Sequence, residues 1–248
     1  MIVRDAGSAW QLVLQPDHAD LSAQFLRAWA ERPEPYGSVL TAVARHDDGW
    51  AVWERAPGLS REGERPRNFL DVEVPAHLAF YRACILAVTE HDPYAGLLVS
   101  MHGAGIYQQR YGTDPGLKLS LAAEFADQVE AFVREQEEGY PRRIAELGLG
   151  EDERWRNYGL LQLFDRLSLY FCMRDLDGGE EAELVDFRLL PAGPWRVTMV
   201  PFPFAESPAR FSLKRRLLPH RRWPDAQAFR TEFFAVEPDR TEIVIEHG

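Results

Sequence analysis

The spacing of hydrophobic and polar positions predicts a β-hairpin at the start of the chain and helices over most of the next 170 residues or so. Residues 2–4 and 10–15 alternate between hydrophobic and polar as strands do, and Asp5 to Ser8 supply turn residues between them. After this hairpin, hydrophobic residues recur at intervals of three and four, the spacing of one helix face. The helices predicted in this way are residues 19–30, 39–45, 75–89, 94–107, 117–136 and 155–173.

The pattern changes after Gly178 and Gly179. Short alternating segments, separated by Pro, Gly and Asp, predict strands at residues 184–190, 196–200, 209–213 and 241–246. We therefore expect a mainly α protein, α+β overall, in which a helical bundle core carries a short N-terminal β-hairpin and a C-terminal antiparallel β element.

The expected division of the chain is a helical domain with its hairpin at residues 1–178 and a β element at residues 179–248 that packs on the same core. Two arrangements of the terminal strands are open. They pair with the opening hairpin in one sheet, which we favour, or they form a small separate lobe.

Charge and composition narrow the expected partners. The chain has 28 basic and 39 acidic residues, and its formal net charge of -11 repels nucleic-acid phosphates and anionic membrane surfaces. A run of about 18 hydrophobic residues, which a membrane span requires, does not occur, and the first residues lack the hydrophobic segment of a signal peptide. We therefore expect a cytoplasmic protein that acts on a small-molecule substrate and binds neither nucleic acid nor membrane. The oligomeric state stays open.

The adjacent pair His46 and Asp47 is the sharpest chemical feature of the sequence. Imidazole nitrogen and carboxylate oxygen together suit divalent Mn, Fe, Co or Zn. Three further histidines, His18, His77 and His102, lie at the start of predicted helices or within them. Each of them alone is more typical of an ordinary helix-start or core residue, so the pattern has to be judged as a whole.

Asp165 lies in the middle of a strongly hydrophobic predicted helix, among Leu163, Phe164 and Leu167. A carboxylate is costly to bury there unless a metal, a cation or several hydrogen-bond donors compensate it. Arg154 and Arg166 are the structural alternatives to a metal.

The order of these residues resembles the metal-ligand pattern of the HD superfamily. That pattern is a helix His, then His-Asp followed by x-Gly, optional further histidines, and an Asp late in a helix; here the likeness spans residues 15–172. It implies an HD-like helical bundle and two divalent ions, Fe or Mn, with Co, Zn or Mg also compatible. The likeness implies that the first ion is held by His18, His46, Asp47 and Asp165, and that Asp47 bridges to a second ion held by His77 and His102.

A second likeness carries no activity. The opening Met1 to Arg4, the stretch from Gln15 to His18, the stretch from His46 to Trp50 and the stretch from Leu98 to His102 resemble an uncharacterised bacterial family with no assigned function.

Most members of the HD superfamily hydrolyse phosphate esters, so the likeness implies a metal-dependent hydrolase of a small phosphoester. Asp47, Asp48 and Arg45 are then the candidate catalytic residues. The same ligand set also resembles that of the di-iron oxygenases in the superfamily, which makes oxidation of a small polar substrate the alternative. A non-catalytic binding protein stabilised by metal is a second alternative.

One departure from the pattern bears on the substrate. The fifth position of the His-Asp-x-Gly stretch is often a Lys or His that meets an anionic substrate, whereas this chain has Trp50. That difference counts against a phosphate. The candidate substrate-binding residues are Trp50 and Tyr107, which could line a pocket for a less charged molecule, and Arg110 and Arg166, which could supply the missing positive charge.

Overall fold

The computed structural model describes residues 1–108, 123–148, 150–174, 176–177 and 179–248. Its helices agree closely with the predicted pattern over the first two thirds of the chain. They are α1 (Gln15–Ala28), α2 (Tyr36–Arg45), α3 (Ala51–Glu54), α4 (Val74–His91), α5 (Pro93–Gln108), α6 (Ala126–Leu147), α7 (Glu151–Met173) and α8 (Ala226–Ala235). Three 3-10 helices join them at Asp48–Trp50 (η1), Phe69–Asp71 (η2) and Ala123–Phe125 (η3).

Three helices differ from the prediction, the shortest of them being the four-residue α3, which was not predicted. The helix expected at residues 117–136 is found as α6, which continues past Pro141 to Leu147, while residues 117–122 lie outside the described part of the chain. Helix α8 was not predicted. It begins after Asp225, whose carboxylate accepts a hydrogen bond of 2.8 Å from the backbone N–H of Ala228 and so caps the helix.

The described strands form one seven-stranded mixed sheet. They are β1 (Ile2–Asp5), β2 (Ala9–Val13), β3 (Ala182–Leu184), β4 (Phe187–Pro191), β5 (Arg196–Val200), β6 (Ala209–Pro219) and β7 (Asp239–His247), in the order β1-β2-β6-β7-β5-β4-β3. Strands β5 and β7 pair in parallel, and the other neighbours pair antiparallel.

This sheet shows that the expected fold class was wrong. The protein is a substantial α/β architecture, not a mainly helical bundle with a short hairpin and an antiparallel β element. The opening hairpin joins the C-terminal strands because Leu12 on β2 pairs with Arg216 on β6, which is one of the two arrangements that the sequence left open. The hydrophobic pattern reports which residues alternate along one strand, but it carries no information on which distant strand supplies the hydrogen-bonding partner.

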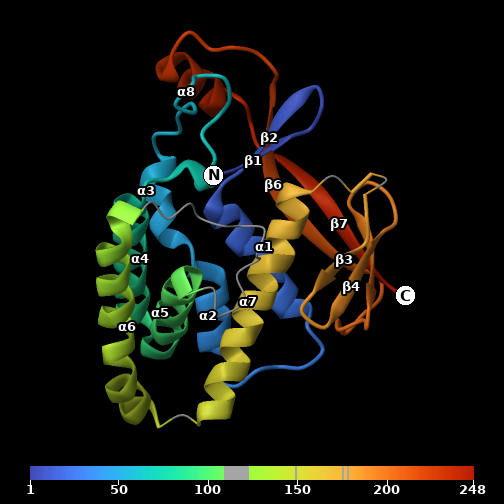
Figure 1. Cartoon of the computed structure of the whole chain (residues 1–248). Coiled ribbons are helices and arrows are strands. Elements are labelled where there is room, and N and C mark those ends of the chain that lie inside the picture. The colour runs from blue at the N-terminus through green and yellow to red at the C-terminus, as the bar shows by residue number, and fades with distance from the viewer. Residues whose placement is uncertain (109–122, 149, 175, 178) are drawn as a thin grey trace.

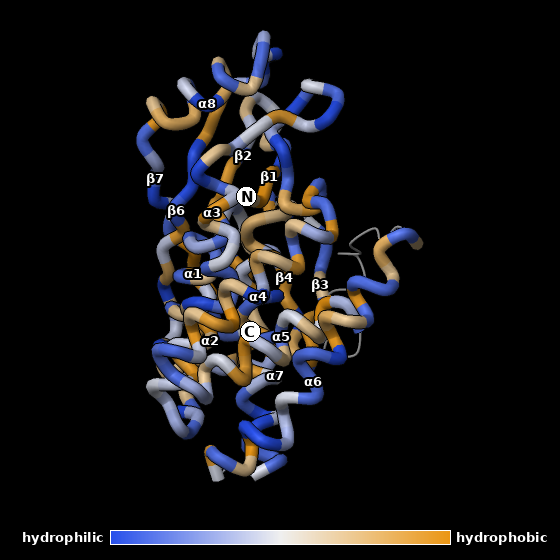
Figure 2. Tube along the Cα trace, turned by 90° about the vertical axis from the view of Figure 1, so that its left-hand side faces the viewer, coloured by the Kyte–Doolittle hydropathy of each residue, from blue (hydrophilic) through white to orange (hydrophobic). Residues whose placement is uncertain are grey.

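Helices α1 to α7 lie on one side of the sheet, and α8 lies apart from them at the upper end of the molecule (Figure 1). Helices α1 and α7 pack together next to the sheet, with α1 against β6, and α2, α5, α4 and α6 follow outward in that sequence of contacts. Helix α5 is hydrophobic around its whole circumference and buried from Tyr94 to Gly105, as expected of a helix surrounded by others. Figure 2 shows the contrast with α6, which is hydrophilic over much of its length.

Close packing of α4 on α5 depends on Gly103. A Cβ atom at this position would lie 2.9 Å from Cδ1 of Tyr81, closer than side-chain atoms approach one another. The absence of a side chain therefore lets Tyr81 pack against α5 one residue beyond His102. This contact sets the distance between Tyr81 and His102, two residues of the candidate site described below.

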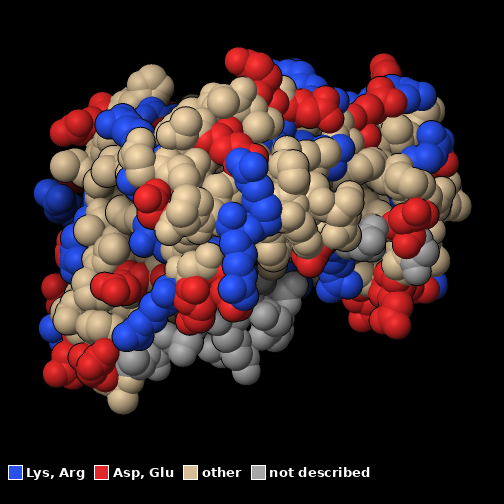
Figure 3. All heavy atoms as spheres, turned by 90° about the horizontal axis from the view of Figure 1, so that it is seen from above, with Lys and Arg blue, Asp and Glu red and all other residues tan. Residues whose placement is uncertain are grey.

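The upper end of the molecule has a small core of its own, in which α8 packs on the opening hairpin. Its buried members are Met1, Leu12, Leu218, Trp223, Phe229 and Phe233. On the face seen from above, Figure 3 shows acidic and basic side chains interspersed, without a broad region of one sign. Over the described residues, the helices are too short or too polar to cross a bilayer.

Candidate metal centre

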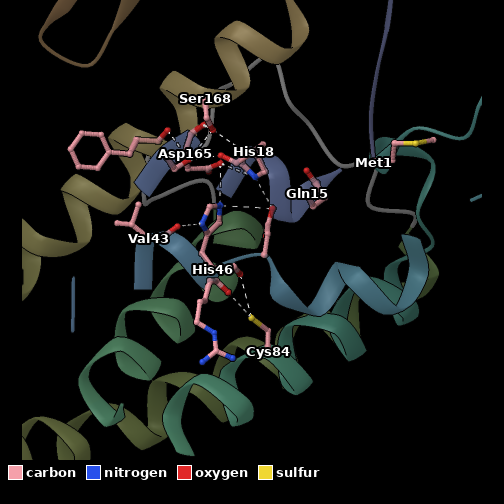
Figure 4. Close-up of polar contacts among 12 residues, drawn as sticks. Met1, Gln15, His18, Val43, His46, Cys84, Asp165 and Ser168 are labelled. Carbon is pink, nitrogen blue, oxygen red and sulfur yellow. Dashed lines mark hydrogen bonds and ion pairs between the residues drawn. The ribbon is translucent and has the colours of Figure 1, made fainter. Parts of the chain in front are cut away.

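The structure brings the six predicted ligand residues to one buried region between helices. His18 lies in the first turn of α1, His46 caps the C-terminus of α2 and Asp47 follows it, while the other three come from α4, α5 and α7. All except Asp165 are less than one tenth exposed, and the Asp165 side chain is 16% exposed. Figure 4 shows His18, His46 and Asp165 directed toward one another.

Four of these residues place donor atoms at distances that suit one cation. His18 Nε2 lies 3.0 Å from Asp47 Oδ2 and 3.9 Å from Asp165 Oδ1. His46 Nε2 lies 3.5 Å from Asp165 Oδ1 and 3.8 Å from Asp47 Oδ2. Ligands about 2.0–2.2 Å from a divalent ion, at angles of roughly 90–110°, lie about 3.0–3.6 Å apart. Ligand atoms of His18, His46 and Asp165 lie within 4.8 Å of one another, so small shifts would bring these three around one ion, with Asp47 Oδ2 next to His18.

His46 provides the observation that tests whether a cation fits. Its Nδ1 lies 2.9 Å from the carbonyl oxygen of Val43, so Nδ1–H donates to that oxygen and the lone pair of the neutral ring is on Nε2. Nε2 is buried without a hydrogen-bond partner and faces the carboxylates of Asp47 and Asp165. A lone pair beside two carboxylates is unfavourable unless a proton or a metal ion lies between them.

The pKa of His46 leads to the same conclusion. Burial lowers this pKa, but the nearby carboxylates of Asp47 and Asp165 outweigh burial and raise the pKa to about 9. The position occupied by the proton is thus one that attracts a cation. The donor set of two imidazoles and two carboxylates fits Mn, Fe, Co or Zn, so the residues present fit a divalent metal.

Asp47 lies between two groups of potential ligands. Its Oδ1 accepts a hydrogen bond of 2.9 Å from the hydroxyl of Tyr81, and its Oδ2 faces His18. Burial by itself raises the pKa of this carboxyl. His46 and His18 lower the pKa by more than burial raises it, and the net effect holds it far below its usual range. The side chain is therefore an ionised carboxylate with both oxygens directed into the cluster.

The second group contains His102 but not His77. Ligand atoms of His46, Asp47 and His102 lie within 4.8 Å of one another. His77 lies outside this group within the described part of the chain, although it lines the same cavity as Asp47 and His102. Its Nδ1 is hydrogen-bonded to the hydroxyl of Tyr107. The HD likeness implies that His77 and His102 both bind the second ion. The geometry supports this role for His102 more directly than for His77.

Burial lowers the pKa of His77 and of His102 to about 4 in each case. Both rings are therefore neutral near pH 7, and the neutral imidazole is the form that binds a metal.

Two serines, which were not predicted as site residues, contact the cluster on the side away from the proposed metal position. Ser168 Oγ lies 2.7 Å from His18 Nδ1 and donates to the carbonyl oxygen of Asp165 at 2.8 Å. Ser22 Oγ lies 2.9 Å from Ser168 Oγ. Ser22 comes four residues after His18 and Ser168 three residues after Asp165, so helical spacing from a ligand is the signal that could have identified them.

A cavity opens beside the cluster, with a volume of about 60 Å³. A bound water needs about 10–15 Å³ on this measure, so the space admits several waters or a small organic group. Neither Lys nor Arg lines it among the described residues. Its walls consist of Gln15, Asp47, Trp50, Phe69, Leu70, His77, Tyr81, His102, Ile106, Asp165 and Leu169.

The other predicted site residues lie in different places. Arg45 and Asp48 pair with each other at 2.7 Å, are each about one third exposed and do not line the cavity. Trp50 lines the cavity, whereas Tyr107 reaches it through its bond to His77, and Arg166 is half-buried and absent from its wall. Arg110 lies outside the described residues.

The chain matches a known protein family over most of its length. The family model of DUF3891, a protein of unknown function, matches residues 1–220. The chain belongs to the DUF3891 family. Neither a curated protein nor a solved structure matches it. In this DUF3891 protein the matched region contains all six predicted ligands and strands β1 to β6, while α8 and β7 lie beyond it.

Proposed function

We propose that this DUF3891 protein is a metal-dependent hydrolase that acts on a small phosphoester. The observation that supports the proposal best is His46 Nε2, which is buried without a hydrogen-bond partner and faces two carboxylates. His18, His46, Asp47 and Asp165 would hold one ion. Asp47 would also face a second ion, toward His102 and the neighbouring His77.

Divalent ions in such a site polarise phosphoryl oxygens and favour the ionisation of water near neutral pH. The protein residues set the conditions for that chemistry. Tyr81 donates to Asp47 Oδ1 and orients the carboxylate, which the neighbouring histidines keep ionised. The cavity wall, made largely of Trp50, Phe69, Leu70, Ile106 and Leu169 on its non-ligand side, excludes bulk water and accommodates the part of the substrate that leaves with its oxygen.

The second candidate function is a di-iron oxygenase, which the same donor set would serve. One observation favours it: among the described residues the cavity has an aromatic and aliphatic wall without Lys or Arg, and an uncharged substrate suits such a wall better than a phosphate does.

Metal analysis of protein purified without chelator tests both candidates, combined with EPR and Mössbauer spectra before and after exposure to oxygen. Manganese, cobalt or zinc, with turnover of a panel of small phosphoesters, is the result expected of the hydrolase. Two irons per chain with an oxygen-sensitive mixed-valent signal would replace the hydrolase by the oxygenase. Protein that takes up no metal would overturn both. A metal without exchangeable water would favour a structural role, as in a metal-stabilised binding protein.

A further inference from the structure

Two polar groups in the cavity wall have no hydrogen-bond partner. The side chains of Gln15 and Trp50 are each 2% exposed, and both line the cavity. Gln15 Oε1 and Trp50 Nε1 are buried and unpartnered. Buried polar atoms in native proteins nearly always have a partner, so two unpartnered atoms on residues of one cavity wall point to a ligand that supplies the missing bonds.

Other polar groups of this wall are already engaged with protein atoms. The Tyr81 hydroxyl donates to Asp47, the Nδ1 of His77 is bonded to Tyr107, and Asp165 faces His18 and His46. Gln15 and Trp50 differ from these residues because each has a polar atom without a protein partner. Gln15 Oε1 is a hydrogen-bond acceptor, and Trp50 Nε1–H is a donor.

The backbone of Gln15 and the ring of Trp50 are held in place by their neighbours. Gln15 is the first residue of α1, three residues before His18, and its backbone N–H donates to both carboxylate oxygens of Glu54 at 2.9 and 3.1 Å. Figure 4 shows Gln15 beside His18 on the same helix. The Trp50 indole packs against the rings of His77 and Phe80, with centroid separations of 5.1 and 5.4 Å.

We propose that Gln15 and Trp50 bind a neutral hydroxyl group on the substrate. A hydroxyl donates one hydrogen bond and accepts others, so it can donate to Gln15 Oε1 and accept from Trp50 Nε1. The hydrophobic remainder of the wall suits a short carbon chain between this hydroxyl and the reacting group. The substrate class is therefore a small hydroxyl-bearing ester, and for the reacting group the inference rests on the proposed hydrolase function.

Discrimination between substrates depends on the same contacts. A pocket built to hydrogen-bond a hydroxyl rejects an analogue without it, because the analogue leaves the buried polar groups unpaired. Hydroxyethyl phosphate and ethyl phosphate form a matched pair that differs in this group alone. We expect wild-type kcat/KM to favour hydroxyethyl phosphate by about tenfold or more. In Gln15→Met, which keeps the length of the side chain, the ratio should fall toward one without loss of metal content.

Gln24→Met is the matched control, because Gln24 lies on the same helix and contacts Ser212 on β6, away from the cavity. It should keep the wild-type ratio. Equal kcat/KM values for the two phosphoesters in the wild-type protein would overturn the proposal. So would a ratio that Gln15→Met leaves unchanged.

A binding measurement separates this proposal from the hydrolase function. The indole N–H resonance of Trp50, assigned from its loss in Trp50→Phe, should shift on titration of the wild-type protein with ethane-1,2-diol, and Gln15→Met should reduce the shift. A shift without turnover of any phosphoester would support the hydroxyl site and count against the hydrolase alone. Failure of the diol to shift this resonance would overturn the hydroxyl site whatever the turnover results.

Discussion

His18 and Ser168 are joined by a contact of 2.7 Å between Nδ1 of the imidazole and the serine Oγ. Ser168 has a single hydroxyl proton, and its carbonyl partner at Asp165 lies 2.8 Å away. When that proton goes to the carbonyl, the serine oxygen must accept from His18 Nδ1–H, which leaves the lone pair of the ring on Nε2. Nε2 faces Asp47 and Asp165, so Ser168 favours the tautomer of His18 that binds a metal.

Replacement of Ser168 by Ala should therefore weaken metal binding without abolishing it. Loss of such a supporting hydrogen bond lowers metal affinity by roughly 10- to 100-fold in other metal sites. Competitive titration with a chromophoric chelator measures the change. Ser100→Ala is the control, because Ser100 is also buried but bonds to Gln136 on α6, and it should keep wild-type affinity. Equal affinities in the two variants would contradict the role of Ser168.

Asp47 and Asp48 are adjacent but lie in different environments. Asp47 is buried, with Oδ2 3.0 Å from His18 Nε2 and a ligand atom grouped with those of His46 and His102, whereas Asp48 pairs with Arg45 at the surface. Asp47→Asn should reduce bound metal to less than about 0.2 ions per chain, since neutralising a shared ligand removes charge from both positions. Asp48→Asn should leave the metal content unchanged. Elemental analysis after gel filtration checks both, and an Asp47→Asn protein with full metal content would refute the assignment.

His102 belongs to one ligand group only. His102→Gln should therefore lower the metal content from about two ions to about one per chain, with the remaining ion held by His18, His46, Asp47 and Asp165. His91 is exposed at the end of α4, and His91→Gln serves as the control that should retain both ions. Loss of both ions in His102→Gln, or of neither, would show that the two positions are not divided in this way.

The stability of the metal-free protein should depend on pH through the buried histidines of the cluster and Asp47. The pKa of His46 is raised from 6.5 to about 9, so its contribution is fully present below pH 6.5 and is lost as the pH rises toward 9. The pKa of Asp47 is lowered from 3.8, so its contribution is present above pH 3.8 and is lost as the pH falls below that value. The pKa values of His77 and His102 are lowered from 6.5 to about 4, so the unfolded chain binds more protons than the folded one below pH 6.5, and stability also falls as the pH drops toward 4. The metal-free protein should thus have its highest Tm near pH 6.5.

The alkaline loss amounts to at most about 3 kcal/mol, from the shift of the His46 pKa. Thermal unfolding monitored by circular dichroism in the presence of chelator measures it. His46→Gln should remove the alkaline decline, and added divalent metal should also remove it, because a cation then takes the place of the proton. A Tm that declines equally between pH 6.5 and about 9 in His46→Gln would exclude His46 as the cause.

Much of the helical part of the protein could be predicted from local spacing. The intervals between Leu21, Phe25 and Leu26, and those around Leu161 and Phe164, are properties of a single helix, and α1 and α7 lie close to the residues predicted for them. The positions of His18, His46 and Asp165 relative to these helices were therefore also predictable. Their meeting in space was expected from the resemblance and not from the spacing itself.

The tertiary structure alone decided the sheet and the details of the site. The pairing of Leu12 with Arg216 joins opposite ends of the chain through backbone hydrogen bonds, which no local pattern records. Likewise, Ser168 reaches His18 and Gln15 reaches the cavity only because α1 packs against α7 in one particular arrangement. Hydrophobic periodicity determines which face of an element is buried, whereas the partner that each buried polar atom meets depends on how distant elements pack.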